Sequence, residues 1–466
     1  MRCFVLALIA SGCAVPPAPE TSISITPVRI LGDGRASATI TVHVTRADGT
    51  PAARWQLACT SSVASDVITP VTPDTGSDGV LVATLRATEG GARTVTCTTG
   101  SWKGVAGMLE VTPVMPACAD PVFSHESIEV AYDFAVGDLD NDGLDDLAVI
   151  RPGDRAFVVQ RGHGNAGFAP AELVVANPFP PRIALGDFDR DGVLDAVTAL
   201  TDIELARGTG DGTFAPAQTI GARADQSIYG IAVGDVNRNG TLDVVGLRSG
   251  AALSGASLVQ IFDGDGRGAL APGFAMTGDG EIDAAVLADF GTGRPDLAAV
   301  GFESSMPGAR SASVLHNWGD SLGAREDVEM LDDPVAIDVG DLDGDGALDI
   351  VTAHPWTAPP EVVVDLARDH WFQSAHVVQP GIQASSIAVG DLTNDGHLDV
   401  VAFDGVQVVI LAGRGDGSFV ALAPHPVDLS TGIPGPSRVA LADVDADGRL
   451  DIVTDKGAVL VQTGCR

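Results

Sequence analysis

Basic residues are scarce in this chain of 466 residues. Lysine and arginine together number 27 against 62 aspartates and glutamates, and the formal net charge is −35. Binding to nucleic acid requires a basic face that neutralises phosphates. The composition therefore argues against a nucleic-acid partner.

Several motifs that carry chemistry are also missing. The nine histidines form no H-E-x-x-H or H-x-H cluster, and the sequence contains no phosphate-binding loop. We therefore expect a protein that is not an enzyme.

Small and turn-forming residues are abundant. Hydrophobic residues make up 45% of the chain, which is enough for large cores, and glycine (56) and proline (28) are frequent. Many glycines and prolines indicate many turns and few long helices.

Aspartates recur in the pattern D-x-D-x-D-G-x-x-D. Residues 138–146 show it first, with Asp138, Asp140 and Asp142 before Gly143 and with Asp146 at the end. Carboxylates this close repel one another, and a divalent cation offsets the repulsion. Calcium takes six to eight oxygen ligands, and alternate residues of a tight loop can supply them. Gly143 allows the left-handed backbone that a sharp turn needs.

The aspartate pattern recurs at intervals of 48 to 54 residues. We name each loop by its first aspartate. Full copies are the Asp187 loop (187–195), the Asp341 loop (341–349) and the Asp443 loop (443–451). Two copies with fewer carboxylates are the Asp235 loop (235–243) and the Asp391 loop (391–399), and a degenerate copy, one residue shorter, is the Asp289 loop (289–296). Together with the Asp138 loop, they define seven units of one repeated supersecondary element.

Each unit carries the pattern of four short strands. In the second unit, apolar segments 183–186 and 196–199 flank the loop, a third segment spans 203–206, and a glycine hairpin at 208–214 leads to a fourth. Four short strands per repeat are typical of a β-propeller blade. The order Phe/Val-x-x-Gly-Asp-x-Asp-x-Asp-Gly resembles the FG-GAP/VCBS repeat of integrin α-chain propellers. The resemblance implies an all-β fold with a seven-bladed β-propeller over residues 118–466; a stacked calcium β-roll would need much shorter repeats.

The resemblance also implies the calcium ligands, position by position. Positions one, three, five and nine supply side-chain oxygens, and position seven supplies a backbone carbonyl. About four strong sites follow: Asp138, Asp140, Asp142, Leu144 and Asp146; Asp187, Asp189, Asp191, Val193 and Asp195; Asp341, Asp343, Asp345, Ala347 and Asp349; and Asp443, Asp445, Asp447, Arg449 and Asp451. Two weaker sites follow from loops with fewer charges, because charge count tunes affinity: Asp235, Asn237, Asn239 and Asp243; and Asp391, Thr393, Asp395 and Asp399. We expect no ion in the Asp289 loop and a structural role for the others.

Residues 20–113 lack aspartate loops and alternate in polarity. Ile40, Val42 and Val44 share one parity while threonines take the other, which predicts strands with one buried face. Segments 39–51, 77–83 and 91–97 resemble bacterial immunoglobulin-like domains of the invasin and intimin class, and this implies an immunoglobulin-like β-sandwich that acts as a spacer. Cys59 and Cys97 both point inward on predicted strands, so we expect an inter-sheet disulfide in an exported protein.

The last repeat unit lacks a fourth strand at the C-terminus. Residues 121–130 supply a candidate at the other end of the predicted propeller, and pairing it with residues 459–465 would remove two open sheet edges. We therefore expect a disulfide between Cys118 and Cys465 that closes the ring.

The N-terminus has the features of an export signal. Residues 1–12 contain one arginine and an apolar run far below the roughly 20 residues of a membrane-spanning helix. Residues 10–13 resemble a bacterial lipobox, which implies a lipid on Cys13, followed by a proline-rich tether at 13–19. We expect a lipoprotein of the bacterial outer membrane or cell surface, with the lipid as its only membrane contact; the alternative is an ordinary signal peptide and a secreted chain.

The expected role is adhesion to, or recognition of, a protein or glycan by a monomer at the cell surface. The connector at 354–360 contains His354 and Trp356 and offers a possible ligand face opposite the calcium loops. One alternative is a carbohydrate-active enzyme with two acids outside the loops, for which Glu172, Glu303 and Glu361 are candidates that form no convincing pair. Another alternative is a surface scaffold without a ligand.

Overall fold

The structure is a computed structural model, and it describes most of the chain beyond residue 19. The described residues are 20–26, 29–31, 38–45, 50, 57–70, 75, 77, 80–87, 91–99, 102–112, 118–152, 154, 156–164, 167–175, 182–200, 202–220, 227–248, 256–303, 310–317, 322–328, 333–368, 371–427 and 437–465. The predicted signal segment 1–12, the lipidation site Cys13 and the tether 13–19 lie outside these ranges.

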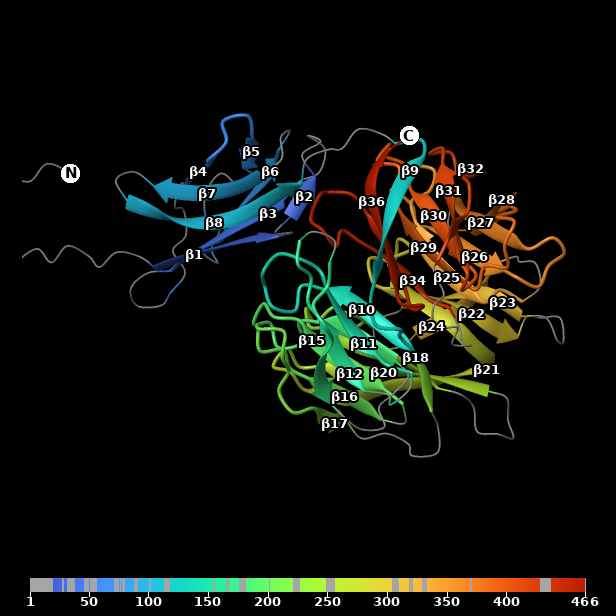
Figure 1. Cartoon of the computed structure of the whole chain (residues 1–466). Helices are drawn as coiled ribbons and strands as arrows, with labels where there is room; N and C mark the ends of the chain where they lie inside the picture. Colours follow the sequence, from blue (N-terminus) through green and yellow to red (C-terminus); the bar gives the residue numbers. More distant parts are fainter. Residues whose placement is uncertain are drawn as a thin grey trace, which may run out of the picture. The chain divides into compact units, whose positions relative to one another are not determined.

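The described chain is all-β and forms two compact units. One unit spans Met1–Met115 and the other Pro116–Arg466. Regular structure in the described ranges consists of strands without helices, as the sequence predicts (Figure 1). No helix within those ranges has the length and apolar character needed to cross a membrane.

The N-terminal unit contains two four-stranded sheets. In order across the sheets, their strands are β1 (Glu20–Thr26), β3 (Ala38–Thr45), β6 (Val80–Arg86) and β5 (Val67–Pro70), and β2 (Arg29–Leu31), β8 (Trp102–Thr112), β7 (Gly91–Thr99) and β4 (Ala58–Ser61). The predicted alternation holds in β3, where Ile40, Val42 and Val44 are buried and Thr39 and His43 are exposed. These buried residues share one core with residues of β6 and β7, so the two sheets pack on each other.

A disulfide joins Cys59 and Cys97, but it does not link the two sheets. Cys59 on β4 lies directly opposite Cys97 on β7, with 3.9 Å between the Cα atoms. The predicted inter-sheet bridge is therefore wrong. Both cysteines do face the core, and their strands are neighbours in the same sheet, so the bridge crosses one strand pair.

The C-terminal unit is built from consecutive antiparallel sheets. The first two are β10 (Asp133–Gly137), β11 (Asp146–Ile150), β12 (Phe157–Gln160) and β13 (Glu172–Val175), then β14 (Arg182–Gly186), β15 (Asp195–Ala199), β16 (Ile203–Ala206) and β17 (Gln218–Ile220). A seven-stranded sheet follows, with β18 (Ile228–Gly234), β19 (Asp243–Arg248), β20 (Ala256–Gly264), β21 (Leu270–Ala288), β22 (Asp296–Glu303), β23 (Arg310–Asn317) and β24 (Leu322–Asp327).

Three further sheets complete this unit. They are β25 (Ala336–Gly340), β26 (Asp349–His354), β27 (Glu361–Arg368) and β28 (Trp371–Val378); β29 (Ser386–Gly390), β30 (Asp399–Phe403), β31 (Gln407–Gly413) and β32 (Phe419–Ala421), with β33 (His425–Pro426) also on β31; and β34 (Val439–Ala442), β35 (Asp451–Thr454), β36 (Ala458–Cys465) and β9 (Pro121–Ser127).

The seven-stranded sheet contains two repeat units joined by one strand. The 19 residues of β21 pair with β20 through their first part and with β22 through their last part. The fourth strand of the third repeat unit is therefore continuous with the first strand of the fourth.

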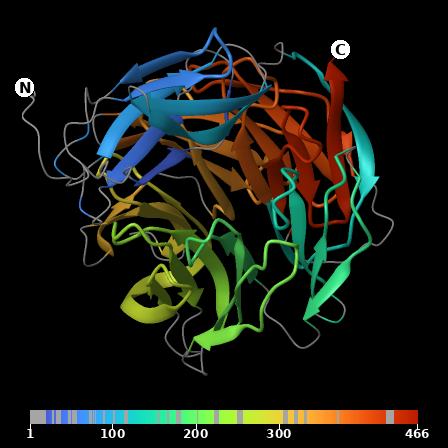
Figure 2. The same cartoon turned by 90° about the vertical axis from the view of Figure 1, so that its left-hand side faces the viewer.

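Buried side chains connect each sheet to the next. Ala148 on β11 shares a cluster with Ile183 on β14, and the pattern continues around the unit. The last cluster joins Val453 on β35 to Val149 on β11, so the final sheet packs on the first. The sheets therefore form a closed ring rather than an open stack (Figure 2).

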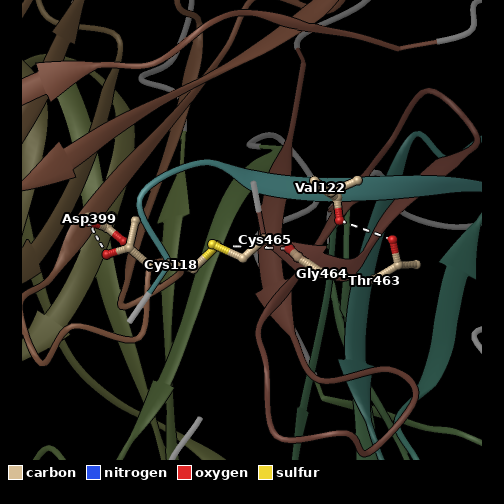
Figure 3. Close-up of a disulfide and its surroundings, with 7 residues drawn as sticks. Cys118, Val122, Asp399, Thr463, Gly464 and Cys465 are labelled. Carbon is tan, nitrogen blue, oxygen red and sulfur yellow. Dashed lines mark hydrogen bonds between the residues drawn. A yellow bond between two sulfur atoms is a disulfide. The ribbon is translucent and has the colours of Figure 1, made fainter. Parts of the chain in front are cut away.

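The two ends of the C-terminal unit meet in one sheet. β9 pairs with β36 antiparallel, with His125 opposite Leu460, as the sequence predicts. The predicted disulfide between Cys118 and Cys465 is present beside this pair, with 5.5 Å between the Cα atoms (Figure 3). The Cys118 N–H also donates to the carbonyl of Thr393, 2.5 Å away, and so ties this end to the neighbouring loop.

We predict that replacing Cys118 and Cys465 with serine lowers the free energy of unfolding of the C-terminal unit by about 3–5 kcal/mol. The bridge spans 347 residues and restricts the unfolded chain strongly. Scanning calorimetry without reductant measures the effect. The matched control replaces Cys59 and Cys97, and should shift only the transition of the N-terminal unit. An unchanged transition of the C-terminal unit in the first variant would contradict the prediction.

Candidate metal centres in the aspartate loops

Each aspartate loop joins the first and second strands of its unit through a turn with two left-handed residues. Gly143, at the sixth position of the Asp138 loop, has φ 89°, as the sequence predicts. Asn141, at the fourth position, also has a positive φ of 59°, which the motif did not predict. The fourth position is left-handed in every nine-residue loop: Asn141, Arg190, Arg238, Gly344, Asn394 and Ala446.

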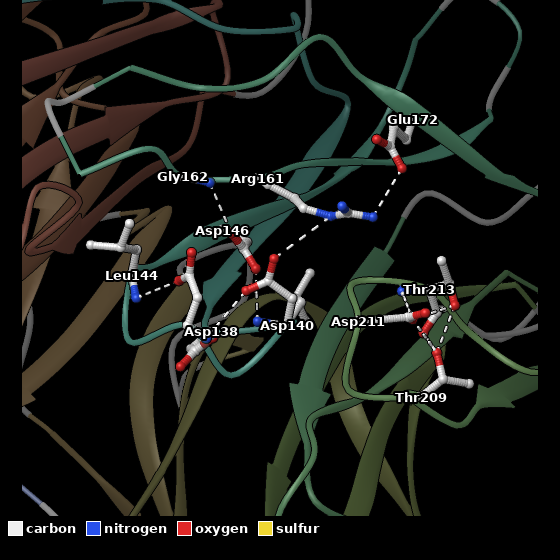
Figure 4. A network of polar contacts seen from close by, with 12 residues as sticks. Asp138, Asp140, Leu144, Asp146, Arg161, Gly162, Glu172, Thr209, Asp211 and Thr213 are labelled. Carbon is white, nitrogen blue, oxygen red and sulfur yellow. Dashed lines mark hydrogen bonds and ion pairs between the residues drawn. The ribbon is translucent and has the colours of Figure 1, made fainter.

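The first aspartate holds this turn through backbone donors. Figure 4 shows this loop with Asp138, Asp140 and Asp146 labelled. The N–H of Asp142 donates to Asp138 Oδ1 at 3.1 Å, and the N–H of Gly143 donates to Asp138 Oδ2 at 3.0 Å. The bond from the sixth-position glycine recurs in all six nine-residue loops, which the structure describes throughout. The loop backbone therefore turns its carboxylates inward.

Four loops bring three carboxylates together. In each, ligand atoms from positions one, three and nine lie within 4.8 Å of one another. The groups are Asp138, Asp140 and Asp146; Asp187, Asp189 and Asp195; Asp341, Asp343 and Asp349; and Asp443, Asp445 and Asp451. An oxygen-only donor set of this kind suits a hard divalent cation.

The fifth-position aspartates are not part of these groups. Asp142 Oδ1 instead accepts the N–H of Leu144 at 2.9 Å, and Asp191, Asp345 and Asp447 make the same bond two residues on. Ligation by these aspartates, and by the seventh-position carbonyls, remains a prediction.

The loops with fewer carboxylates keep the turn. Gly240 donates to Asp235 and Gly396 donates to Asp391, as in the full loops. Their third positions make other bonds, since the Thr393 hydroxyl donates to Asp399 Oδ1 at 3.5 Å. Among the described residues, the Asp235, Asp289 and Asp391 loops contain no group of three clustered acidic, histidine or cysteine ligands.

The last aspartate of each loop has a second use that sequence reasoning missed. Asp146 is fully buried, and it accepts the N–H of Leu139 in its own loop at 2.8 Å and the N–H of Gly162 after β12 at 2.8 Å. The same bridge occurs in every repeat unit, and all seven aspartates are described: Asp146, Asp195, Asp243, Asp296, Asp349, Asp399 and Asp451. The degenerate Asp289 loop lacks the middle carboxylates but keeps this last aspartate. That difference is the signal in the sequence that the last aspartate has a role beyond metal binding.

Glycine at the start of the hairpin allows this bridge to form. A Cβ at Gly162 would lie 2.6 Å from the carbonyl of Asp145, and one at Gly208 would lie 2.3 Å from the carbonyl of Leu194. The close approach of the two backbones therefore requires a residue without a side chain in these units.

Burial shifts the protonation of these aspartates. Desolvation raises the pKa of Asp146, Asp195 and Asp243, although their backbone donors act in the opposite direction. Burial is also the main cause that raises the pKa of Asp349 to about 6 and that of Asp451 to about 8. A proton therefore competes with a cation for these oxygens, and cation affinity should fall as the pH is lowered.

Arginines near the loops offset part of the negative charge. Arg368, at the end of β27, pairs with both Asp343 and Asp345 of the Asp341 loop. Arg161 lies 3.8 Å from Asp140, and Arg207 lies 3.7 Å from Asp189. The Arg368 guanidinium thus contacts Asp343, which belongs to a candidate metal group, and Asp345, which does not.

The predicted ligand face at residues 354–360 loses one of its two named residues. His354 is fully buried as the last residue of β26, and its Nε2 lies 2.9 Å from the Thr352 hydroxyl. It therefore cannot contribute to an exposed face, because its strand turns it into the core. Trp356 is 71% exposed and remains a candidate contact residue.

Comparisons with known proteins fit this geometry. Residues 138–198, 199–246 and 391–454 each match the FG-GAP-like repeat. No curated protein sequence matches the chain. The solved structure of BBS1N in complex with ARL6DN is 12% identical, covers 74% of this chain and 99% of its own, and has a TM-score of 0.50.

Two further solved structures have lower TM-scores. Rhamnogalacturonan lyase PL11 from Bacillus licheniformis is 12% identical, with coverage of 93% and 88% and a TM-score of 0.43. Sqt1 from Chaetomium thermophilum is 10% identical, with coverage of 75% and 100% and a TM-score of 0.45. Of these three structures, only that of BBS1N reaches a TM-score of 0.50, and its likeness concerns the fold alone. The chain is thus a β-propeller-like protein with three FG-GAP-like repeats and acidic clusters that could hold metal ions.

We predict that Asp296→Asn destabilises the C-terminal unit by about 2 kcal/mol, equally with and without a chelator. Asp296 accepts the N–H groups of Phe290 and Asn317 in the loop where we expect no ion. An amide replaces one acceptor with a donor and leaves one of these N–H groups unpaired. Denaturant unfolding measures the change, with the exposed Asp154→Asn as control. A loss that disappears with EDTA would mean that this aspartate acts through a cation instead.

We predict that Arg368→Gln raises the cation affinity of the Asp341 loop several-fold. The substitution removes a positive charge that pairs with Asp343 and Asp345. Terbium luminescence titrations on the whole chain would show the tighter site, and Arg151→Gln, which removes an exposed Arg151–Asp154 pair, is the matched control. Equal affinity in wild type and in Arg368→Gln would contradict the prediction.

Proposed function

We propose that this chain is an exported, calcium-binding β-propeller that recognises a protein or glycan at the cell surface without catalysis. In this proposal, the C-terminal unit is a seven-bladed propeller, and the N-terminal unit is an immunoglobulin-like sandwich that acts as a spacer. A monomer attached through a lipid on Cys13 would present the propeller outside the cell.

One observation carries the calcium assignment. Four equivalent loops each gather three carboxylates within 4.8 Å. These donors are oxygens only, which favours calcium over the metals that prefer nitrogen or sulfur ligands. The Asp235 and Asp391 loops keep the same turn with fewer charges, and we propose that they bind calcium more weakly.

Sheet topology supports seven blades. The chain has seven loops of one pattern, and the long strand β21 accounts for two of the units in a single sheet. The last sheet takes its fourth strand, β9, from the beginning of the unit, which closes the ring.

The disulfides support export. Bridges such as Cys59–Cys97 and Cys118–Cys465 persist in oxidising compartments and are rare in the cytosol. Two four-stranded sheets around one core support the sandwich assignment of the N-terminal unit.

The proposed absence of catalysis rests on how the loop carboxylates are used. Both carboxylate oxygens of each ninth-position aspartate accept backbone N–H groups. A metal ion bound to such a loop would therefore stabilise the fold. Of the acids outside the loops that could serve a glycosidase, Glu172 pairs with Arg161 at 3.0 Å, and the side chain of Glu303 lies outside the described residues.

We predict that chelation lowers the melting temperature of the C-terminal unit by several degrees, and that calcium restores it, because an ion that binds the folded state stabilises it. Calorimetric titration of the full chain should detect about four strong calcium sites, in line with the four carboxylate groups.

Single substitutions make this test specific. Asp187→Asn should remove one strong site, whereas Asp289→Asn, at the first position of the degenerate loop, should leave the stoichiometry unchanged. An identical melt with calcium and with EDTA would defeat the proposed calcium role.

A further inference from the structure

The repeat changes at the border between the Asp289 loop and the Asp341 loop, and a cavity of about 520 Å³ lies there. At the border of the first and second units and at that of the second and third, the glycine hairpin of one unit closes over the loop of the unit before it. Gly212 donates to the Leu139 carbonyl at 3.1 Å, and Gly268 donates to the Phe188 carbonyl at 3.2 Å.

The hairpin next to the Asp289 loop differs in sequence and register. Ala367 pairs with Phe372, five residues on, whereas Gly208 pairs with Phe214, six residues on. Residues 367–372 also contain no glycine, and the Asp289 loop is itself one residue short. Both differences fall at the border where the cavity lies.

Two aromatic rings form an apolar part of the cavity wall. Phe290 and Phe372 meet edge to face, with their centroids 5.5 Å apart, and both line the cavity. Each ring is only partly buried. They therefore offer an apolar surface beside polar groups.

In the polar part of the wall, a histidine stands where the first repeat unit has an arginine. His316 Nε2 lies 3.0 Å from Glu326, and both line the cavity. The first repeat unit has Arg161 and Glu172 at the corresponding positions. Glu172 pairs with Val159 as Glu326 pairs with Val314, and the basic residue follows two positions later in both units. The shorter imidazole leaves room that an arginine would fill.

The remaining charges decide which ligand suits this cavity. Asp289, Glu326 and Asp345 provide acceptors, while the Arg368 guanidinium provides donors only. Hydroxyl groups both donate and accept, so a polyhydroxylated ring matches this mixture and can lay its C–H face on the phenylalanines. An anion would meet three carboxylates, and a simple amine offers no acceptor to the Arg368 guanidinium, which already pairs with Asp343 and Asp345. The volume falls in the usual range of small-molecule sites.

We propose that this cavity binds one or two sugar residues of a neutral glycan. This inference rests on the proposed recognition function. It places the ligand beside the Asp289 loop, which lacks the carboxylate cluster of the full loops. The site binds the sugar without a chemical reaction. Glu326 and His316 are the polar binding residues, and the two phenylalanines form the stacking surface.

Saturation-transfer NMR on the full chain with calcium tests this site. The probes are D-glucose, D-galactose, D-mannose, N-acetylglucosamine and L-rhamnose, with putrescine and methyl phosphate as charged comparisons. We expect transfer to at least one sugar and none to methyl phosphate. Transfer to putrescine alone, or to no sugar, would overturn the proposal.

Two variants locate the binding. Glu326→Gln should weaken sugar binding by about tenfold or more, because a partly buried, charged acceptor is lost. His316→Arg restores the Arg–Glu pair of the first repeat unit, so it should keep the fold and exclude the sugar by filling the cavity. Glu172→Gln is the control at the matching position and should bind normally. Unchanged binding in both cavity variants would overturn the proposal.

The calcium-dependent melt is recorded on the same samples. If calcium stabilises the chain and no sugar binds, the sugar proposal fails while the calcium-binding propeller stands. If calcium has no effect, the proposed calcium role fails whatever the sugars do.

Discussion

The architecture of the C-terminal unit depends on a buried aspartate that bridges two backbone segments. In each repeat unit this side chain accepts one N–H from its own loop and one from the end of the third strand, as Asp146 does with Leu139 and Gly162. Backbone donors at these places would otherwise be buried without partners, which is costly. The carboxylate therefore fixes the loop against the hairpin before any ion binds.

A cation would act on a loop that is already turned. The first aspartate is held by N–H groups of the turn, and the left-handed fourth and sixth residues set its shape. Carboxylates brought this close repel one another, and Arg368 shows one way in which the chain offsets such charge. The structural bridge and the candidate metal group share the ninth-position aspartate, so loop order and ion binding are linked through one side chain.

The degenerate loop shows which parts of the motif are separable. It has lost the middle carboxylates yet keeps Asp296 with its two backbone donors. The fold thus tolerates the loss of a metal cluster but retains the bridge. Where the chain is no longer constrained by ion ligands, it has gained the aromatic pair Phe290 and Phe372 and a cavity.

The sequence by itself determined the repeat, the turns and the way the ring is closed. Spacing and polarity are local properties, and the missing final strand left β9 and Cys118 as the complement of β36 and Cys465. Only the tertiary structure decided which inward-facing side chains became neighbours. Periodicity gives the face of a strand and not its partner strand, so Cys59 bonded within its own sheet and His354 entered the core. Contacts between repeat units, such as those around the cavity, arise from chain segments far apart in sequence, and no local pattern encodes them.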